Sequence, residues 1–279
     1  MSSDTPTASP FSLRYWREMP NDRMPKIILI AVSLCVVCSF FVALSAISLK
    51  SLQEQNKLDE KRMNIIQVAG LAGKSGSIDE IFSQYIEARV VDLEVGSLTE
   101  RFDPHTFDAL ASREDPNLSR ILTTAEDLAK IKVRENNAVV YLVKNELGAN
   151  TSIILPIRGY GLWSTLYGFV SVSLDDSNTI NGLQFYDQAE TPGLGAEVDN
   201  PRWRALWQGK KIYADDTVKI SVKKGNQSNN DYGVDALSGA TLTSNGVHNL
   251  VQFWMGPLGF QNFLSGIQKV KNYGKDPFA

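Results

Sequence analysis

The chain has 279 residues, a formal net charge of −3 and 43% hydrophobic residues, enough to build one sizeable core and a separate anchor. Because basic residues are not in excess, the chain lacks the attraction for phosphate that nucleic-acid binding requires, and we predict no nucleic-acid partner. Two cysteines and two histidines are too few for a disulfide framework, a cysteine-bound iron–sulfur cluster or a zinc site. Both cysteines, Cys35 and Cys38, fall inside a long apolar run, where cysteine behaves as a small hydrophobic residue.

Residues 1–25 are polar and contain four prolines, so we predict a flexible N-terminal tail. Residues 26–49 are predicted to form a transmembrane helix. The 23 residues from Ile27 to Leu49 carry no charge, and a rise of about 1.5 Å per residue takes them across a hydrocarbon core of roughly 30 Å. A cleaved signal peptide ending at Ala43-Leu-Ser45 is the alternative, but its apolar segment is usually about 7–15 residues long. Four basic residues precede the run and four follow it, so charge does not set the orientation.

Residues 50–135 are predicted to be a juxtamembrane helical region. Helices are expected at residues 51–70, 78–86 and 123–134. Ser77 is the expected cap of the second helix, and Thr123 with Glu126 has the spacing of a capping box at the third. Between these two helices, Asp-Pro pairs indicate turn-rich chain.

Residues 136–279 are predicted to fold as one domain. Strands are expected at residues 138–143, 152–157, 167–174, 180–186 and 219–223, separated by turn residues. The short gap between Leu174 and Ile180 favours an antiparallel hairpin. Apolar residues spaced as on one helix face predict helices near residues 247–254 and 260–270. The predicted fold class is α+β, with a single N-terminal transmembrane helix plus one soluble domain that has an antiparallel sheet and flanking helices.

The stretch Asp235-Ala-Leu-Ser-Gly-Ala-Thr-Leu-Thr-Ser244 combines small residues with hydroxyls immediately before an apolar helix face. Hydroxyl and amide side chains in this place are typical of N-caps, since their oxygens accept the unpaired N–H groups of the first turn. A helix N-terminus preceded by glycine also offers a phosphate free N–H donors and the positive end of the helix dipole. By itself, however, the pattern is equally typical of a capped surface helix.

Three more features precede this motif: Gly159-Tyr-Gly-Leu-Trp-Ser164, Glu190-Thr-Pro-Gly-Leu-Gly195 and Lys223. Each has a simple structural interpretation, as a tryptophan anchored in the core, a Pro-Gly turn and a solvated lysine. Gly225-Asn-Gln-Ser cannot serve as a Gly-x-Gly-x-x-Gly loop, so the chain carries no fingerprint for NADH.

Together and in this order, these motifs resemble those of the FMN-binding C subunits of bacterial Na⁺-translocating NADH:quinone oxidoreductases (Nqr). The resemblance implies that residues 136–279 are an FMN-binding domain and that a flavin transferase joins the phosphate of FMN to the Thr241 hydroxyl. The motif also contains Ser238, Gly239, Ala240, Leu242 and Thr243. Its small residues leave the approach to phosphate uncrowded. Without the resemblance to this family, the chemistry of the motif does not decide whether Thr241 or Thr243 is the attachment residue. Asp235 is expected to belong to the signal that the transferase recognises.

The remaining site residues are expected to surround the flavin ring. Trp163 and Leu194 are expected to pack on the ring, and Gly195, the next residue in the chain, is also expected at the binding site. Glu190 and Thr191 are expected to hydrogen-bond the ring. Lys223 is expected to offset negative charge on the phosphate or on the reduced flavin.

The resemblance implies an electron-relay subunit of an NADH:ubiquinone reductase that exports Na⁺, with sister subunits A, B, D, E and F as partners. Single electrons would pass from an iron–sulfur centre of the sister subunits to the covalent flavin of the B subunit, and NADH would be oxidised in another subunit. The implied location is the bacterial inner membrane, in contact with lipid, with the soluble domain in the periplasm. The alternatives are the G subunit of an Rnf complex, against which Gly-Leu-Trp-Ser favours Nqr, and a membrane-anchored binding or scaffold protein without cofactor.

Overall fold

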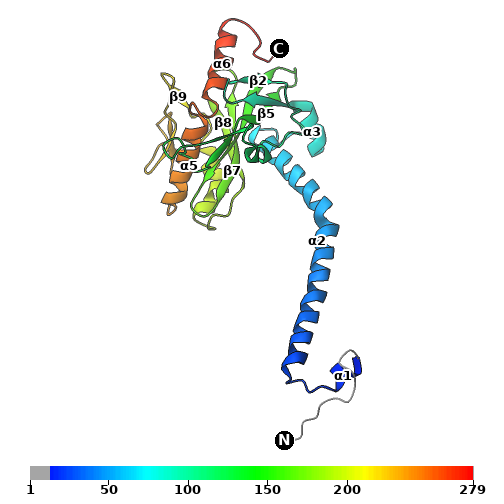
Figure 1. The fold of residues 1–279 in the computed structure, drawn as a ribbon. Coiled ribbons are helices and arrows are strands. Elements are labelled where there is room, and N and C mark those ends of the chain that lie inside the picture. The colour runs from blue at the N-terminus through cyan, green and yellow to red at the C-terminus, as the bar shows by residue number, and fades with distance from the viewer. Residues whose placement is uncertain (1–12, 279) are drawn as a thin grey trace. The chain divides into compact units, whose positions relative to one another are not determined.

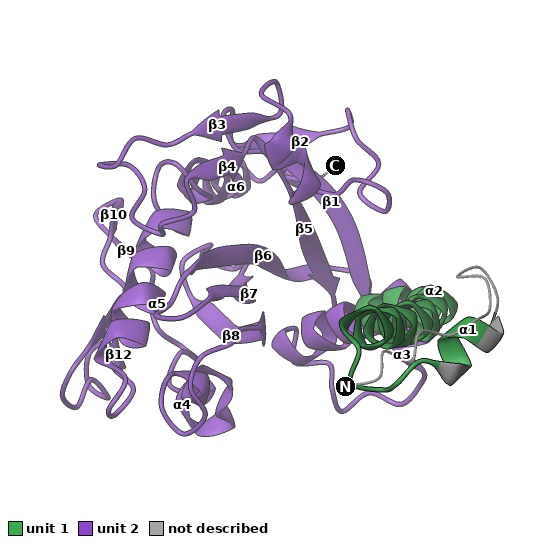
Figure 2. Cartoon of the chain, turned by 60° about the horizontal axis from the view of Figure 1, so that its bottom comes forward, with its two compact units in different colours: residues 1–58 green, residues 59–279 purple. Residues whose placement is uncertain are grey.

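The computed structural model describes residues 13–278. The chain divides into two compact units, with the boundary between residues 58 and 59 (Figure 2). Residues 1–12 of the predicted flexible tail lie outside the described residues. The rest of the predicted tail contains the short helix α1, Leu13–Glu18. Helix α2, Met24–Val68, includes the predicted span and is long and apolar enough to cross a membrane. It continues well beyond the apolar run, and its residues 59–68 belong to the second unit.

A six-stranded antiparallel sheet organises the second unit, with the strand order β2-β1-β5-β6-β7-β8. Its strands are β1 Ile86–Asp92, β2 Ser97–Thr99, β5 Asn137–Lys144, β6 Asn150–Tyr160, β7 Thr165–Ser173 and β8 Ile180–Asp187. The continuous apolar run in β5 is buried on both faces of the sheet, as its sequence predicts. Strands β7 and β8 form the predicted hairpin.

Shorter elements connect and cover this sheet. They are α3 Ile78–Tyr85, the 3₁₀ helix η1 Ala111–Glu114, β3 Ser119–Ile121, β4 Val133–Glu135, the 3₁₀ helix η2 Gly195–Asp199, α4 Pro201–Ala205, β9 Tyr213–Ala214, β10 Thr217–Val218, β11 Ser221–Lys223, β12 Gly233–Asp235, α5 Thr241–Trp254 and α6 Gln261–Asn272. Three two-stranded sheets result: β3 with β4, β9 with β10, and the parallel pair β11 with β12.

The two faces of the large sheet bury separate hydrophobic clusters. One face packs against α5 and α6 through residues such as Val247, Leu250 and Phe263. The other packs against α3 and the last turn of α2, where Ile65 and Ile66 are 1% and 2% exposed (Figure 1). Because fully burying such a side chain contributes about 1.5–3 kcal/mol, the end of α2 is an integral part of the domain.

The predicted helical region over residues 50–135 is correct only as far as Tyr85. Helix α2 ends just before Gly70, a glycine with φ +75°, and α3 begins with a complete capping box at Ser77. Residues 86–92 then form β1, which pairs with β5 over seven residues, so the predicted border at 135/136 would cut through one sheet. The predicted border is therefore wrong.

The helix predicted over residues 123–134 is also wrong. The Glu126 carboxylate does accept hydrogen bonds from the backbone N–H and hydroxyl of Thr123, both at 2.9 Å. However, Lys130 and Lys132 have φ of 54° and 63°, a left-handed conformation that an α-helix cannot continue through. The capping interaction therefore closes a turn, and the chain enters β4.

Candidate functional site

The hydroxyl-rich motif forms a tight turn and the first turn of α5. Gly239 has φ +74°, which glycine adopts without strain, and Ala240 precedes the helix without a side-chain cap. The predicted N-cap role of the hydroxyl side chains is wrong, because the helix begins at Thr241 and contains Thr243 and Ser244. Instead, the Ser244 hydroxyl accepts a hydrogen bond from the Leu237 N–H at 2.9 Å and ties the helix back to the turn. The N–H groups of the first helical residues have no partner within the helix.

The two threonines of this turn lie in opposite environments. Thr241 is the first helical residue and is exposed to solvent. Thr243 is 1% exposed, and its hydroxyl donates a hydrogen bond to Oε2 of Glu190 at 2.7 Å. Of these two hydroxyls, that of Thr241 is therefore the one open to a macromolecule that approaches the helix N-terminus.

The Glu190 carboxylate connects α5 to the turn between β6 and β7. Its Oε1 accepts hydrogen bonds from the backbone N–H groups of Leu162, Trp163 and Ser164 at 3.0, 2.9 and 3.2 Å. Glu190 is 5% exposed, and burial raises the pKa of its carboxyl. The hydrogen bonds from Thr243 and the three N–H groups outweigh burial, so the net pKa is lowered and the group stays ionised at neutral pH.

Three glycines allow these segments to approach so closely. A Cβ on Gly161 would lie 2.6 Å from Oε1 of Glu190, and one on Gly195 would lie 2.6 Å from Oγ1 of Thr243. A Cβ on Gly246 in α5 would lie 2.5 Å from the carbonyl oxygen of Tyr160. Any other residue would force these segments apart, so the glycines fix the geometry of the site.

Three large apolar side chains remain exposed around the start of α5. Trp163, Leu242 and Leu194 are 67%, 58% and 44% exposed. Leu194 reaches over the turn of the motif, since its Cδ2 lies 3.1 Å from the place of a Cβ on Gly239. We call these three residues the apolar rim. Two clefts of about 670 and 360 Å³ lie elsewhere in the second unit, and neither is lined by a rim residue.

Known proteins resemble this chain in sequence. Residues 161–256 match the model of the FMN-binding domain family. The C subunit of the Na(+)-translocating NADH-quinone reductase of Pseudomonas aeruginosa is 46% identical over 250 residues, which cover 87% of this chain and 95% of the relative. The corresponding protein of Pasteurella multocida is 46% identical over 254 residues, covering 89% and 96%. The chain belongs to this family of C subunits.

Solved structures also resemble the chain. The crystal structure of NqrC from Shewanella oneidensis has a TM-score of 0.71 at 33% identity and covers 77% of this chain and 99% of that one. That of the C subunit from Parabacteroides distasonis has a TM-score of 0.62 at 29% identity, with 78% and 97% covered. The α+β fold predicted from the sequence is therefore that of the C subunits.

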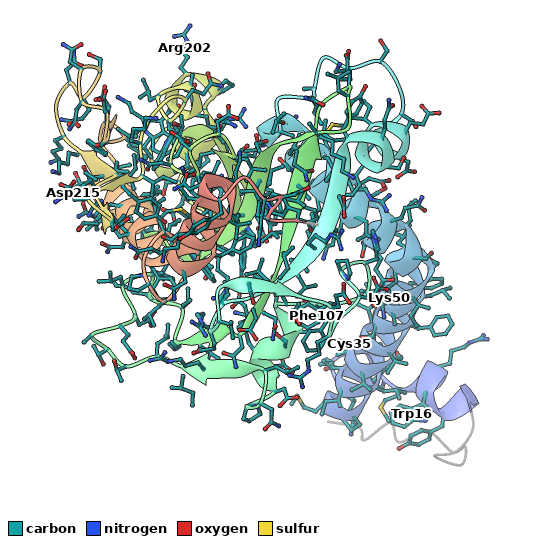
Figure 3. The ribbon with its side chains drawn as sticks, turned by 90° about the horizontal axis from the view of Figure 1, so that it is seen from above. Trp16, Cys35, Lys50, Phe107, Arg202 and Asp215 are labelled. Carbon is teal, nitrogen blue, oxygen red and sulfur yellow. The ribbon has the colours of Figure 1, made fainter. Side chains whose placement is uncertain are left out.

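Asp235 and Lys223 lie on the neighbouring parallel strands β12 and β11, where they are paired. Oδ1 of Asp235 accepts a hydrogen bond from the Gln227 N–H at 2.6 Å, and its carbonyl oxygen accepts one from Nε1 of Trp203 at 2.8 Å. Both contacts hold the chain that leads into the motif. On α4, Trp203 faces the core while Arg202 points into solvent (Figure 3).

Lys223 is exposed, and within the described residues no hydrogen bond joins it to Thr241. It lies near His248 of α5, whose Nδ1 accepts a hydrogen bond from the Val222 N–H at 3.3 Å. Burial lowers the pKa of His248, and the positive charge of Lys223 lowers it further. This imidazole is therefore neutral at pH 7.

The structure brings most of the predicted site residues together. Trp163, Leu194, Gly195, Glu190 and Thr243 meet at the start of α5, and Thr191 closes the loop by accepting hydrogen bonds through its carbonyl oxygen. Sequence reasoning missed Gly246 and Trp203 as residues that shape the site, and it expected a capping role for Ser244. Of the two missed residues, Gly246 gives a local signal, since a glycine inside a helical pattern suggests close packing.

Proposed function

We propose that this chain is an electron-relay subunit of a Na⁺-translocating NADH-quinone reductase and carries FMN bound covalently through its phosphate to Thr241. One observation carries the assignment of the residue. Of the two neighbouring threonines, Thr241 is exposed at a helix N-terminus, whereas Thr243 is buried and its hydroxyl is bonded to Glu190. A transferase needs an accessible hydroxyl, and this criterion separates the two residues where sequence chemistry does not.

The attachment is a phosphoryl transfer onto Thr241. Its Oγ would attack the FMN phosphorus of a flavin dinucleotide, the anhydride bond to the nucleoside monophosphate would break, and the threonine proton would pass to a base of the flavin transferase. A dinucleotide is required as donor because FMN alone has no activated bond to drive formation of the new ester. The product keeps a negatively charged phosphodiester. The unpaired N–H groups and the dipole at the start of α5 suit such a group.

The surroundings of Thr241 also fit a flavin. The apolar rim offers exposed apolar surface beside the attachment point, and Trp163 provides an aromatic face. Bound FMN would supply the capacity to accept and release electrons one at a time. Because both oxygens of Glu190 already accept hydrogen bonds from the chain, we assign it to the support of the site and not to the ring, while Thr191 stays a candidate hydrogen-bond partner. Lys223 would act as a nearby positive charge, and Asp235 belongs to the segment presented to the transferase.

The anchor and the domain suit a relay at a membrane. Helix α2 would hold the chain in the bacterial inner membrane with the domain in the periplasm. Free FMN is scarce outside the cytoplasm, so a reversibly bound cofactor would be lost by mass action, which covalent attachment prevents. The partners would be the A, B, D, E and F subunits, with electrons arriving from an iron–sulfur centre and leaving to the covalent flavin of the B subunit.

The test is to express the full chain with and without a flavin transferase and to measure its intact mass under denaturing conditions. We expect an FMN-sized increase only with the transferase. It should be lost in Thr241→Ala and retained in Thr243→Val, which removes the second hydroxyl but keeps its shape. Loss in Thr243→Val with retention in Thr241→Ala would move the attachment to the other threonine, and no increase in the unaltered chain would refute the proposal.

A further inference from the structure

The Glu190 side chain joins two segments that are distant in the sequence. Its Oε1 accepts hydrogen bonds from the N–H groups of residues 162–164 in the turn between β6 and β7, which we call the Trp163 turn. These residues lie 26 to 28 positions away in the sequence. Its Oε2 accepts a hydrogen bond from the hydroxyl of Thr243, 53 residues away. Because each oxygen serves a different segment, the length of this side chain sets the separation between the Trp163 turn and α5.

We infer that Glu190 is a positioning residue for flavin attachment, which holds the Trp163 turn against the start of α5 and keeps the Thr243 hydroxyl away from the transferase. This inference rests on the proposed function and adds to it a device that makes Thr241 the sole acceptor. The transferase would meet two threonines separated by one residue. In the folded chain one of these two hydroxyls is free, because the other is buried and bonded to an ionised acceptor.

The close packing around Glu190 shows that the carboxylate has little freedom to move. A Cβ on Gly161 or on Gly195 would lie within 2.8 Å of its oxygens. Both walls of its site are therefore backbone, and the backbone N–H of Glu190 is itself bonded to Oε1 of Gln188 at 2.7 Å. A side chain shortened by one methylene, about 1.5 Å, could reach one segment and would release the other.

The experiment compares two substitutions that separate reach from charge. Glu190→Asp keeps the charge and loses the reach. Glu190→Gln keeps the reach, since its carbonyl oxygen can accept the three N–H bonds while its amide donates to the Thr243 oxygen. Glu197→Asp is the matched control, because the side chain of this neighbouring carboxylate accepts a hydrogen bond from the Asn200 side chain and does not join the two segments. All are made in the full chain.

Two readouts are taken. Amide hydrogen exchange of residues 162–164 is measured on the chain without flavin, and the rate and position of FMN attachment are measured after mixing with a flavin transferase. Glu190→Asp should lose about tenfold or more in amide protection. It should also either load Thr241 at least about tenfold more slowly or place FMN partly on Thr243. Glu197→Asp should stay within about threefold of the unaltered chain, and Glu190→Gln, whose hydrogen bonds are neutral and weaker, should lose clearly less than Glu190→Asp in both readouts.

Each outcome has one meaning. If Glu190→Asp matches the unaltered chain in amide protection and in FMN attachment, the inference is overturned. If in addition Glu190→Gln loses protection or attachment, then the charge of the side chain matters and its length does not. Equal losses in both variants would overturn it as well. An unaltered chain that never acquires FMN on Thr241 refutes the proposed function instead, and the exchange measurement still tests whether Glu190 holds the two segments together.

Discussion

Gly246 gives the sharpest test of how the site is assembled. It lies inside α5, where alanine would normally stabilise the helix by about 0.8–1 kcal/mol over glycine. Here an alanine Cβ would lie 2.5 Å from the Tyr160 carbonyl oxygen and 2.8 Å from Cα of Gly161. These are backbone atoms that no side-chain rotation can move, so α5 and the β6–β7 turn must separate.

The magnitude follows from the balance of the two effects. Overpacking of this kind costs typically about 1–3 kcal/mol, and contact with backbone places Gly246 in the upper part of that range. After the helix gain is subtracted, Gly246→Ala should lower the free energy of unfolding by about 1–2 kcal/mol. The second unit spans residues 59–279, and for a domain of this size the melting temperature falls by roughly 2–4 °C per kcal/mol.

Gly266 in α6 provides the control, because a Cβ there would meet nothing closer than 3.6 Å, the carbonyl oxygen of Gly96. Gly266→Ala should therefore raise the free energy of unfolding by about 0.5–1 kcal/mol. The assay is thermal unfolding of the full chain in detergent, followed by near-ultraviolet circular dichroism of the tryptophans. If Gly246→Ala stabilises the chain as much as Gly266→Ala does, the close approach of α5 to the β6–β7 turn is refuted.

Three further predictions concern charge, packing and the rim. The lowered pKa of Glu190 contributes stability that is present above its unfolded pKa of about 4.5 and is lost as pH falls through the folded pKa. The free energy of unfolding of Glu190→Gln, measured against pH, should therefore fall less steeply below about pH 4.5 than that of the unaltered chain. Glu135→Ala, which removes the partner of buried Arg158 at 2.5 Å, should cost about 3–5 kcal/mol in denaturant unfolding; a cost below about 1 kcal/mol would contradict the pairing. Trp163→Ala should change stability by no more than about 0.5 kcal/mol, because the side chain is 67% exposed, but should raise the fluorescence yield of attached FMN. Unchanged fluorescence would exclude Trp163 from the ring contact.

The spacing of apolar and turn residues predicted those elements whose structure is determined by nearby residues. The apolar run at residues 138–143, the β7–β8 hairpin and the periodic faces of α5 and α6 all signal themselves within a few residues. Strand β1 does not, because it follows α3 without any turn residue, and its place in the sheet is decided by pairing with β5, which comes much later in the chain. Such non-local pairing overrides local preference.

In the candidate site, too, local motifs were predictable from the sequence and contacts between distant segments were not. The motifs identified the segments, but not how their side chains are used. Glu190 was expected at the flavin ring, and its bonds to Thr243 and the Trp163 turn connect residues 26 to 53 positions apart, which no spacing rule can predict. The start of α5 was misplaced because its hydroxyl residues are typical of caps, whereas the left-handed Gly239 lets the helix begin at Thr241.

Fragmentation mass spectrometry of one peptide tests the central claim most directly. Trypsin cleaves after Lys224 and next after Lys269, so residues 225–269 leave as one peptide that contains both threonines. After expression with a flavin transferase, the account predicts an FMN-sized mass increase on fragments that include Thr241, with Thr243 unmodified. FMN on Thr243, or a peptide without FMN, would contradict the account.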